Sequence, residues 1–263
     1  MNPSPRALVT GASAGIGRSY AQHLARTGHA LVLVARRADR LNALADELRQ
    51  AHGIEVEVLP ADLESDDGVQ RVVERLAAEP AVDLLVNNAG YAARGRVAEL
   101  DADATAAMLR VNVLALTRLS IAAMSRMMAA GRGRIINVAS GTVFMQMPGN
   151  AGYGASKNYV MAFTRTMQAE AAGTGVHVQL LIPGVIATDF HEVAGNAISN
   201  FPPDRVMSAD DLVVASLRAL EMEEAICIPS LPDVADWDAY VAAEQKLVHN
   251  VSRDRPAARY HAS

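Results

Sequence analysis

Short apolar runs alternate with longer amphipathic stretches over most of the chain. The apolar runs are rich in Val, Leu and Ile, which is typical of strands that are buried on both faces of a parallel sheet. We predict seven strands, at residues 7–9, 30–34, 56–59, 84–86, 134–138, 176–182 and 225–228.

The stretches between the apolar runs form helical patterns that are rich in Ala, Leu and Arg. We predict helices at residues 15–27, 38–51, 65–78, 103–130, 153–172 and 209–222. A strand followed by a helix, repeated along the chain, gives a parallel sheet with helices on both faces. The sequence therefore predicts a doubly wound α/β fold with a sheet of about seven strands.

No repeat, charge block or Pro-rich linker divides the 263 residues, so we expect a single domain over residues 1–263. Residues 189–208 mix turn formers with apolar side chains, a composition that suits a flexible lid over a pocket. The apolar members of this segment are Phe190, Val193, Ile198 and Phe201. Residues 230–263 form a C-terminal tail, in which 236–248 is predicted to be helical.

Charge and cysteine content exclude several classes of function. The net charge is -5 and the arginines are scattered, so nucleic acid is not an expected partner. Cys227 is the only cysteine, which excludes a disulfide within the chain and a metal cluster built on thiolates, and we expect no metal. The N-terminus lacks a secretory pattern, and no uninterrupted apolar segment is long enough to span a bilayer. We therefore expect a cytoplasmic enzyme without a membrane partner.

A glycine-rich loop joins the first predicted strand to the first helix. Gly11, Gly15 and Gly17 permit a tight turn, and with Ser13 and Ile16 they form a loop that brings backbone close to a pyrophosphate at the helix N-terminus. A glycine turn of this kind also serves simply to join a strand to a helix. Its position at the first crossover favours dinucleotide binding.

Two arginines end the second predicted strand, where NAD-binding sites carry an acidic residue that binds the adenosine ribose hydroxyls. Here Arg36 and Arg37 stand in place of that acidic residue, so no carboxylate repels a 2'-phosphate and two guanidinium groups supply charge-assisted donors to it. This favours NADP(H) over NAD(H). The alternative is that both arginines belong to a solvated helix start beside Asp39 and Arg40.

Tyr153 and Lys157 are four residues apart at the start of a predicted helix, so they share one helix face. A close ammonium favours the phenolate and suits the tyrosine to acid/base work. The pair alone is also compatible with an ordinary helix surface. Ser140 follows one predicted strand and the turn 87–90 follows another, at the edge where ligand crevices form. The structural alternatives are a loop hydroxyl for Ser140 and turn formers for residues 87–90. Asn112, in the long predicted helix, is a further candidate, and its structural alternative is an amide that bridges backbone groups.

Together these motifs resemble the short-chain dehydrogenase/reductase family in order and approximate spacing. The shared pattern comprises the glycine loop, the Asn-Asn-Ala-Gly turn, Ser140, the Tyr153 and Lys157 pair, and Pro183-Gly184. It extends from residue 6 to about residue 229. Each motif is a weak signal, whereas the joint pattern is specific. The resemblance implies a Rossmann-type oxidoreductase domain that transfers hydride between a nicotinamide cofactor and a carbonyl or alcohol.

The resemblance also implies residue roles. Tyr153 is expected to be the general acid in carbonyl reduction and Ser140 to polarise the substrate oxygen. Lys157 is expected to lower the Tyr153 pKa and hold the nicotinamide ribose, and Asn112 to anchor a water that links Lys157 to solvent. The expected NADP(H) contacts are Gly11, Ser13, Gly15, Ile16, Gly17, Arg36, Arg37, Asp62, Leu63, Asn88, Ala89, Gly90, Tyr153, Lys157, Pro183, Gly184, Ile186 and Thr188.

The apolar run 143–147 and the lid residues favour an uncharged or hydrophobic ketone or aldehyde, while Arg94 and Arg96 suit an anionic substrate. A 3-oxoacyl thioester reductase and a hydroxysteroid dehydrogenase are the nearest alternatives, and a non-catalytic dinucleotide-sensing protein is a remote one. The family implies a homodimer or homotetramer. Its association surface would involve the helix at 153 and the long helix, through Met108, Leu116, Met124 and Met128. Packing in the core is the alternative explanation of the same residues.

Overall fold

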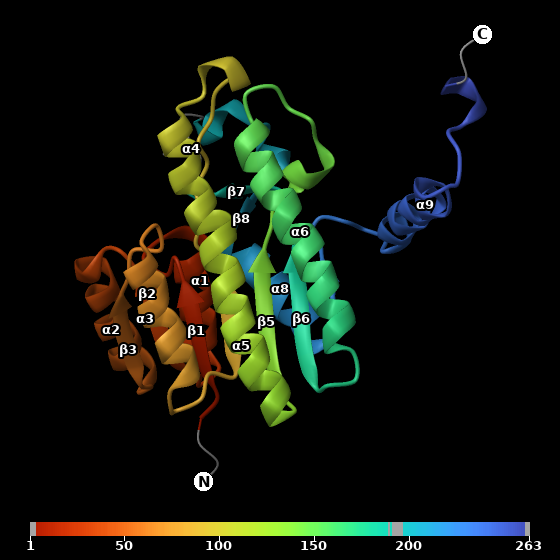
Figure 1. Ribbon diagram of the computed structural model, residues 1–263. Coiled ribbons are helices and arrows are strands. Elements are labelled where there is room, and N and C mark those ends of the chain that lie inside the picture. The colour runs from red at the N-terminus through yellow and green to blue at the C-terminus, as the bar shows by residue number, and fades with distance from the viewer. Residues whose placement is uncertain (1–3, 189, 191–196, 261–263) are drawn as a thin grey trace. The chain divides into compact units, whose positions relative to one another are not determined.

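The computed structural model describes residues 4–188, 190 and 197–260, and its main feature is a seven-stranded parallel sheet (Figure 1). The strand order is β3-β2-β1-β4-β5-β6-β9, which confirms the predicted doubly wound sheet. The strands are β1 (Arg6–Thr10), β2 (Ala30–Ala35), β3 (Val56–Pro60), β4 (Leu84–Asn87), β5 (Gly133–Val138), β6 (Val176–Leu181) and β9 (Ile226–Cys227). The chain order reverses direction between β1 and β4, so a ligand crevice is expected beyond the carboxyl ends of these strands.

Helices cover both faces of the sheet (Figure 1). They are α1 (Gly15–Arg26), α2 (Ala38–His52), α3 (Asp66–Ala77), α4 (Ala102–Leu109), α5 (Leu116–Ala130), α6 (Ala151–Ala171) and α8 (Ala209–Glu221). The buried side chains form two clusters, one on each face. Ala7 and Val9 of β1 belong to the cluster with α1, α2 and α8, whereas Leu8 belongs to the cluster with α3, α5 and α6. Alternate residues of one strand thus enter opposite cores, which is why the central strands are apolar throughout.

A second sheet of two strands was not predicted. It pairs β7 (Val185–Ala187) with β8 (Val206–Ser208) in parallel, and its first strand contains Ile186. Three-residue strands carry too little periodicity to stand out among neighbouring turn formers. These strands flank most of the predicted lid, whose described parts include Phe190, η4 (Ile198–Asn200) and η5 (Pro203–Arg205). Val193 lies outside the described residues.

The long predicted helix is interrupted in its middle. Between α4 and α5 lies η2 (Arg110–Ala115), a π-helical segment that contains Asn112. Such segments widen a helix locally and often occur at functional sites. By length and composition the run Ala102–Ala130 would also pass for a membrane span, contrary to the sequence-based expectation. Half of its most apolar window is buried inside the molecule, as in a core helix, so this is weak evidence for a span.

The contacts divide the chain into two compact units, Met1–Pro229 and Ser230–Ser263. The first unit holds both sheets, together with the short helices η1 (Val97–Glu99) and η3 (Gly141–Phe144). The second unit contains α9 (Ala235–Val251) and η6 (Ala258–Tyr260), so the tail is helical as predicted, and the Trp237 and Tyr240 rings pack 5.3 Å apart on α9. A single domain over the whole chain stays a prediction.

Candidate active site

The glycine loop between β1 and α1 has no room for a side chain at Gly11 or Gly17. A Cβ at Gly17 would collide with the Gly11 carbonyl, and one at Gly11 would lie 2.8 Å from Nδ2 of Asn88. Ala14 at the N-cap of α1 makes no side-chain cap, and the first turn holds no acidic residue. The first N–H groups of α1 therefore have no side-chain acceptor. They leave an electropositive helix end, which suits an anionic pyrophosphate.

The turn after β4 is tied to the glycine loop. The Thr10 hydroxyl accepts hydrogen bonds from the backbone N–H groups of Asn88 and Ala89, both at 3.0 Å. Nδ2 of Asn88 in turn donates to the Thr10 carbonyl at 2.9 Å. A Cβ at Gly15 would lie 3.2 Å from the Thr188 methyl, so the segment after β7 closes on the same loop. Four predicted cofactor contacts, Gly15, Asn88, Ala89 and Thr188, are thus brought to one place.

The adenosine end of the predicted cofactor site carries exposed charges. Nη1 of Arg36 lies 3.1 Å from Oε1 of Glu64, and Nη2 of Arg37 donates to the Ser13 hydroxyl at 3.3 Å. Oδ1 of Asp62 accepts from the Glu64 N–H at 3.0 Å, just before α3 begins. Both arginines therefore face the predicted site, rather than pairing with Asp39 on the start of α2. Glu64 was not among the predicted site residues.

Tyr153 and Ser140 meet beyond the end of β5. Tyr153 lies near the start of α6 and is buried, and its hydroxyl is hydrogen bonded to the Ser140 side chain. The Gly141 N–H donates to the Pro183 carbonyl at 2.7 Å, which joins Ser140 to the predicted Pro183-Gly184 contact. The ring of Phe190, from the predicted lid, lies 5.8 Å from the Tyr153 ring. An apolar ring thus lies beside the Tyr153 ring.

Lys157 reaches the same place from one turn further along α6. Its ammonium lies 5.8 Å from the Tyr153 ring centroid and donates to the Val138 carbonyl at 2.8 Å. A Cβ at Gly90 would lie 3.5 Å from Nζ of Lys157 and 2.9 Å from Oδ1 of Asn112. The four predicted catalytic residues are therefore gathered from the loop after β5, from η2 and from α6 around the turn that follows β4.

Asn112 is held by the backbone of Tyr91. Its Oδ1 accepts from the Tyr91 N–H at 3.1 Å, and its Nδ2 donates to the Tyr91 carbonyl at 2.9 Å and to the Ser156 hydroxyl at 3.1 Å. The structural alternative of an amide that bridges backbone groups is thus what the structure shows. It does not conflict with the expected role, because the same amide borders Gly90 and Lys157.

Burial sets the protonation states of the two central groups. Loss of solvent raises the pKa of Tyr153 to about 12, against the smaller opposing effects of the Ser140 hydrogen bond and the Arg94 charge. Burial lowers the pKa of Lys157 to about 8. Tyr153 therefore carries its proton at neutral pH, which is the state required of a proton donor in carbonyl reduction.

The features of this edge fit a nicotinamide dinucleotide. The uncapped helix end, the glycine loop without room for a Cβ and the two arginines match the anionic groups of such a ligand in one continuous stretch. Of the other predicted contacts, Leu63 and Ile186 are buried, Ile16 in the first turn of α1 is half-buried, and Gly184 between β6 and β7 is exposed. Within the described residues, no cluster of three or more His, Cys, Asp or Glu side chains suits a metal ion.

The predicted association surface needs correction. Met108, Leu116 and Met124 are buried in the core of the first unit, and only Met128 of the four named residues is exposed. The exposed apolar side chains of this helical run are Leu114, Ile121 and Met128, spaced seven residues apart. Packing in the core, the alternative explanation of these residues, therefore accounts for the three that are buried.

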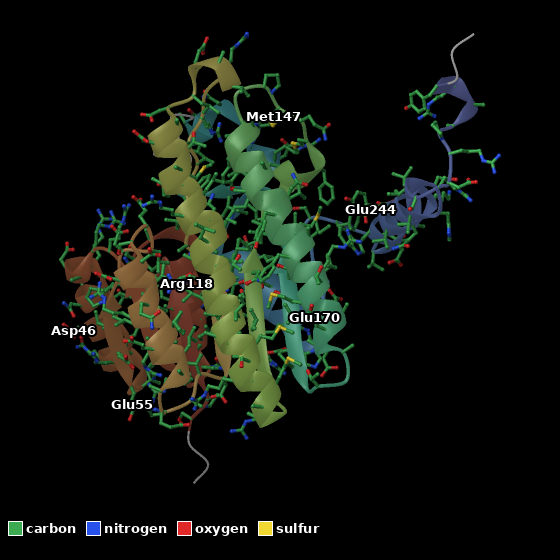
Figure 2. All side chains as sticks on the ribbon, viewed as in Figure 1. Asp46, Glu55, Arg118, Met147, Glu170 and Glu244 are labelled. Atoms are coloured by element: carbon green, nitrogen blue, oxygen red, sulfur yellow. The ribbon has the colours of Figure 1, made fainter. Side chains whose placement is uncertain are left out.

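The predicted substrate-contacting run 143–147 contains both buried and exposed side chains. Val143 is buried, whereas Phe144, Met145 and Met147 are exposed, and Met147 lies toward the end of the unit where the strands have their carboxyl ends (Figure 2). These exposed side chains are available to line a substrate site. Tyr91 and Glu64 are the residues that sequence reasoning missed, because a lone tyrosine and a lone glutamate carry no motif of their own.

Known proteins resemble both the sequence and this arrangement. The family model "short chain dehydrogenase" matches residues 5–198. A short-chain dehydrogenase from Sphingobium yanoikuyae, solved in complex with NADPH, is 38% identical, with a TM-score of 0.93 over 97% of this chain and 100% of that one. The bulky-bulky ketone specific alcohol dehydrogenase from Comamonas testosteroni is 32% identical, with a TM-score of 0.89 over 98% and 99%.

A further relative matches the sequence over most of the chain. Human 17-beta-hydroxysteroid dehydrogenase type 3 is 31% identical over 254 residues, which are 92% of this chain and 79% of that protein. The family match covers well over half of the chain and agrees with the fold and the site geometry. The chain belongs to the short-chain dehydrogenase/reductase family of oxidoreductases.

Proposed function

We propose that the protein is an NADPH-dependent carbonyl reductase, which converts an uncharged or hydrophobic ketone or aldehyde reversibly to the alcohol. The observation that carries the proposal is the convergence of Tyr153, Ser140, Lys157 and Asn112 beside the glycine loop. The NADPH complex and the bulky-ketone dehydrogenase among the similar structures support the cofactor and the substrate class.

Each residue has a distinct task in this proposal. The nicotinamide ring supplies the hydride when the cofactor is bound. As negative charge grows on the carbonyl oxygen, the Ser140 hydroxyl and the Tyr153 phenol stabilise it, and Tyr153 donates its proton. Lys157 holds its ammonium 5.8 Å from the Tyr153 ring centroid, where a positive charge stabilises the phenolate that forms as the proton leaves. Asn112 holds Tyr91 and the turn around Gly90 in place.

Cofactor preference follows from the exposed end of the site. Arg36 and Arg37 offer two guanidinium groups to a 2'-phosphate, and Arg37 already contacts the glycine loop through Ser13. We therefore propose that NADP(H) binds more tightly than NAD(H). The exposed helix face with Leu114, Ile121 and Met128 supports a homodimer or homotetramer, and we keep the cytoplasm as the proposed location.

An anionic substrate is the second candidate, and one observation favours it. Within the described residues Arg94 has no hydrogen-bond or ion-pair partner, yet its charge acts on Tyr153. A carboxylate substrate, or an acyl thioester whose carrier bears a phosphate, would pair with this exposed guanidinium. An anionic substrate would lose affinity in Arg94→Ala, whereas a neutral ketone would not.

Titration of the purified protein with NADPH and NADH tests the proposal first. It is followed by absorbance assays at the reduced nicotinamide band with neutral ketones, aldehydes, hydroxysteroids and acyl thioesters. Tight NADPH binding with turnover of bulky neutral ketones is the expected result. Binding of neither dinucleotide would refute the assignment. Binding without turnover of any carbonyl would favour the dinucleotide-sensing alternative.

A further inference from the structure

Glu64 stands between the adenosine end of the site and its catalytic end. Its carboxylate pairs with the Arg36 guanidinium at 3.1 Å and is also hydrogen bonded to the Tyr91 hydroxyl. Burial and the Glu64 charge raise the pKa of Tyr91 to about 12, so this phenol remains the donor in its bond with the carboxylate. Only 30% of the Glu64 side chain is exposed, against 64% for Arg36. The carboxylate is therefore the more fixed partner of the ion pair.

Local structure holds Glu64 in this position. Its N–H donates to Oδ1 of Asp62 at 3.0 Å, and the next residue, Ser65, caps α3 by accepting from the Gly68 N–H at 3.0 Å. A capped helix start fixes the backbone conformation that precedes it. On the other side, the backbone of Tyr91 is bound by both atoms of the Asn112 amide. Glu64 thus has little freedom to turn away when a ligand approaches Arg36.

We propose that Glu64 is a cofactor-specificity residue, which occupies Arg36 in the absence of a 2'-phosphate and weakens the preference for the phosphorylated dinucleotide. The inference rests on the proposed binding of NADP(H) by Arg36 and Arg37. A 2'-phosphate that binds Arg36 competes with the carboxylate for the charge and the N–H donors of the guanidinium. It also brings a negative charge toward a fixed one, and both effects oppose binding.

The sign of the effect separates this role from a supporting one. If Glu64 acted by orienting Arg36 for the phosphate, its removal would weaken phosphate binding. If it acts as a competitor and a like charge, its removal strengthens binding. An exposed ion pair contributes up to about 1 kcal/mol, which corresponds to about fivefold in a binding constant.

Calorimetric titration with cofactor fragments tests the inference without any turnover. The probes are adenosine 2',5'-bisphosphate and adenosine 5'-monophosphate, which differ only in the 2'-phosphate. We expect Glu64→Gln to bind the bisphosphate about three- to fivefold more tightly than the wild type and to bind the monophosphate within about twofold. Glu64→Ala should shift the bisphosphate affinity in the same direction.

A matched control removes a carboxylate elsewhere. Glu221 pairs with Arg218 on α8, also at 3.1 Å, so Glu221→Gln changes the net charge equally and should leave both fragment affinities unchanged. Weaker or unchanged bisphosphate binding by Glu64→Gln would overturn the role of Glu64 while leaving the proposed function intact. If the wild type bound neither fragment, nor NADPH or NADH, the proposed function itself would fail and the inference would fall with it.

Discussion

The two ends of the candidate cofactor site are built by opposite physical means. At the catalytic end Tyr153, Lys157 and Asn112 are 6%, 5% and 1% exposed, and each is held by neighbours within the protein. At the adenosine end Arg36 is 64% exposed and pairs with one carboxylate. Burial shifts pKa values and orders the reacting groups, whereas exposed guanidinium groups retain full charge and mobility for recognising a phosphate.

Substitution at the catalytic end should have the largest effect. We expect Tyr153→Phe to lower kcat by about 10³-fold or more, because the phenylalanine has no proton to donate. Binding of NADPH should stay within about twofold, since the adenosine end is unchanged. Single-turnover absorbance assays with parallel binding titrations check both quantities. Residual activity above a few per cent would remove Tyr153 from the acid role.

Reversal of charge at the adenosine end should have a smaller and selective effect. We expect Arg36→Asp with Arg37→Ala to weaken NADPH binding by about 100-fold while changing NADH binding by less than about fivefold, because only NADPH carries the 2'-phosphate. Fluorescence titration with both cofactors provides the measurement. Arg218→Asp on α8 is the control for an arginine charge reversed elsewhere on the protein. Equal losses for the two cofactors would argue against recognition of the 2'-phosphate.

Burial of Lys157 at the catalytic end should make the free energy of unfolding depend on pH. Burial holds the pKa of Lys157 at about 8 in the folded protein, below the ordinary lysine value of 10.5, so the unfolded chain binds more protons between these two pH values. The free energy of unfolding should therefore rise with pH across this window, and its lysine penalty should be fully present below pH 8. Each pKa unit corresponds to about 1.4 kcal/mol. Lys157→Met should thus be more stable than the wild type by up to about 3 kcal/mol at pH 7.

Urea unfolding at pH 7 and near pH 10.5 measures this difference, which should nearly vanish at the higher pH. The raised pKa of Tyr153 lowers stability only above about pH 10 and does so in both proteins. Lys246 on α9 is the only other lysine and is exposed, so Lys246→Met provides a matched control with no such pH dependence. A constant difference between wild type and Lys157→Met at all pH values would contradict the burial argument.

Salt should produce the smallest effect. Exposed charges are screened within about 8 Å at physiological ionic strength, whereas buried groups are screened much less. We expect NADPH affinity to fall about fivefold between 50 and 500 mM salt, as the contribution of Arg36 and Arg37 is screened. The pH profile of kcat should shift little over the same range. A large salt shift in that profile would show that the catalytic end is more open to solvent than its burial indicates.

Sequence reasoning was most successful where a signal is local. The main strands and helices were predicted to within a few residues, because apolar runs and amphipathic stretches report directly on burial. The motif positions placed Ser140, the turn 87–90 and the glycine loop at one edge of the sheet. The short strands β7 and β8 and the π-helical η2 were missed, since neither produces a distinctive periodicity.

The sequence by itself therefore determined the family, the doubly wound sheet and the residues that meet at its carboxyl edge, because repeated local patterns and motif spacing encode them. Only the tertiary structure decided the partners of those residues. Asn112 binds Tyr91 and Ser156, which are 21 and 44 residues away, and Arg36 binds Glu64, 28 residues away. Which face of α5 is exposed, and how strongly Tyr153 and Lys157 are desolvated, depend on packed neighbours that no local pattern specifies.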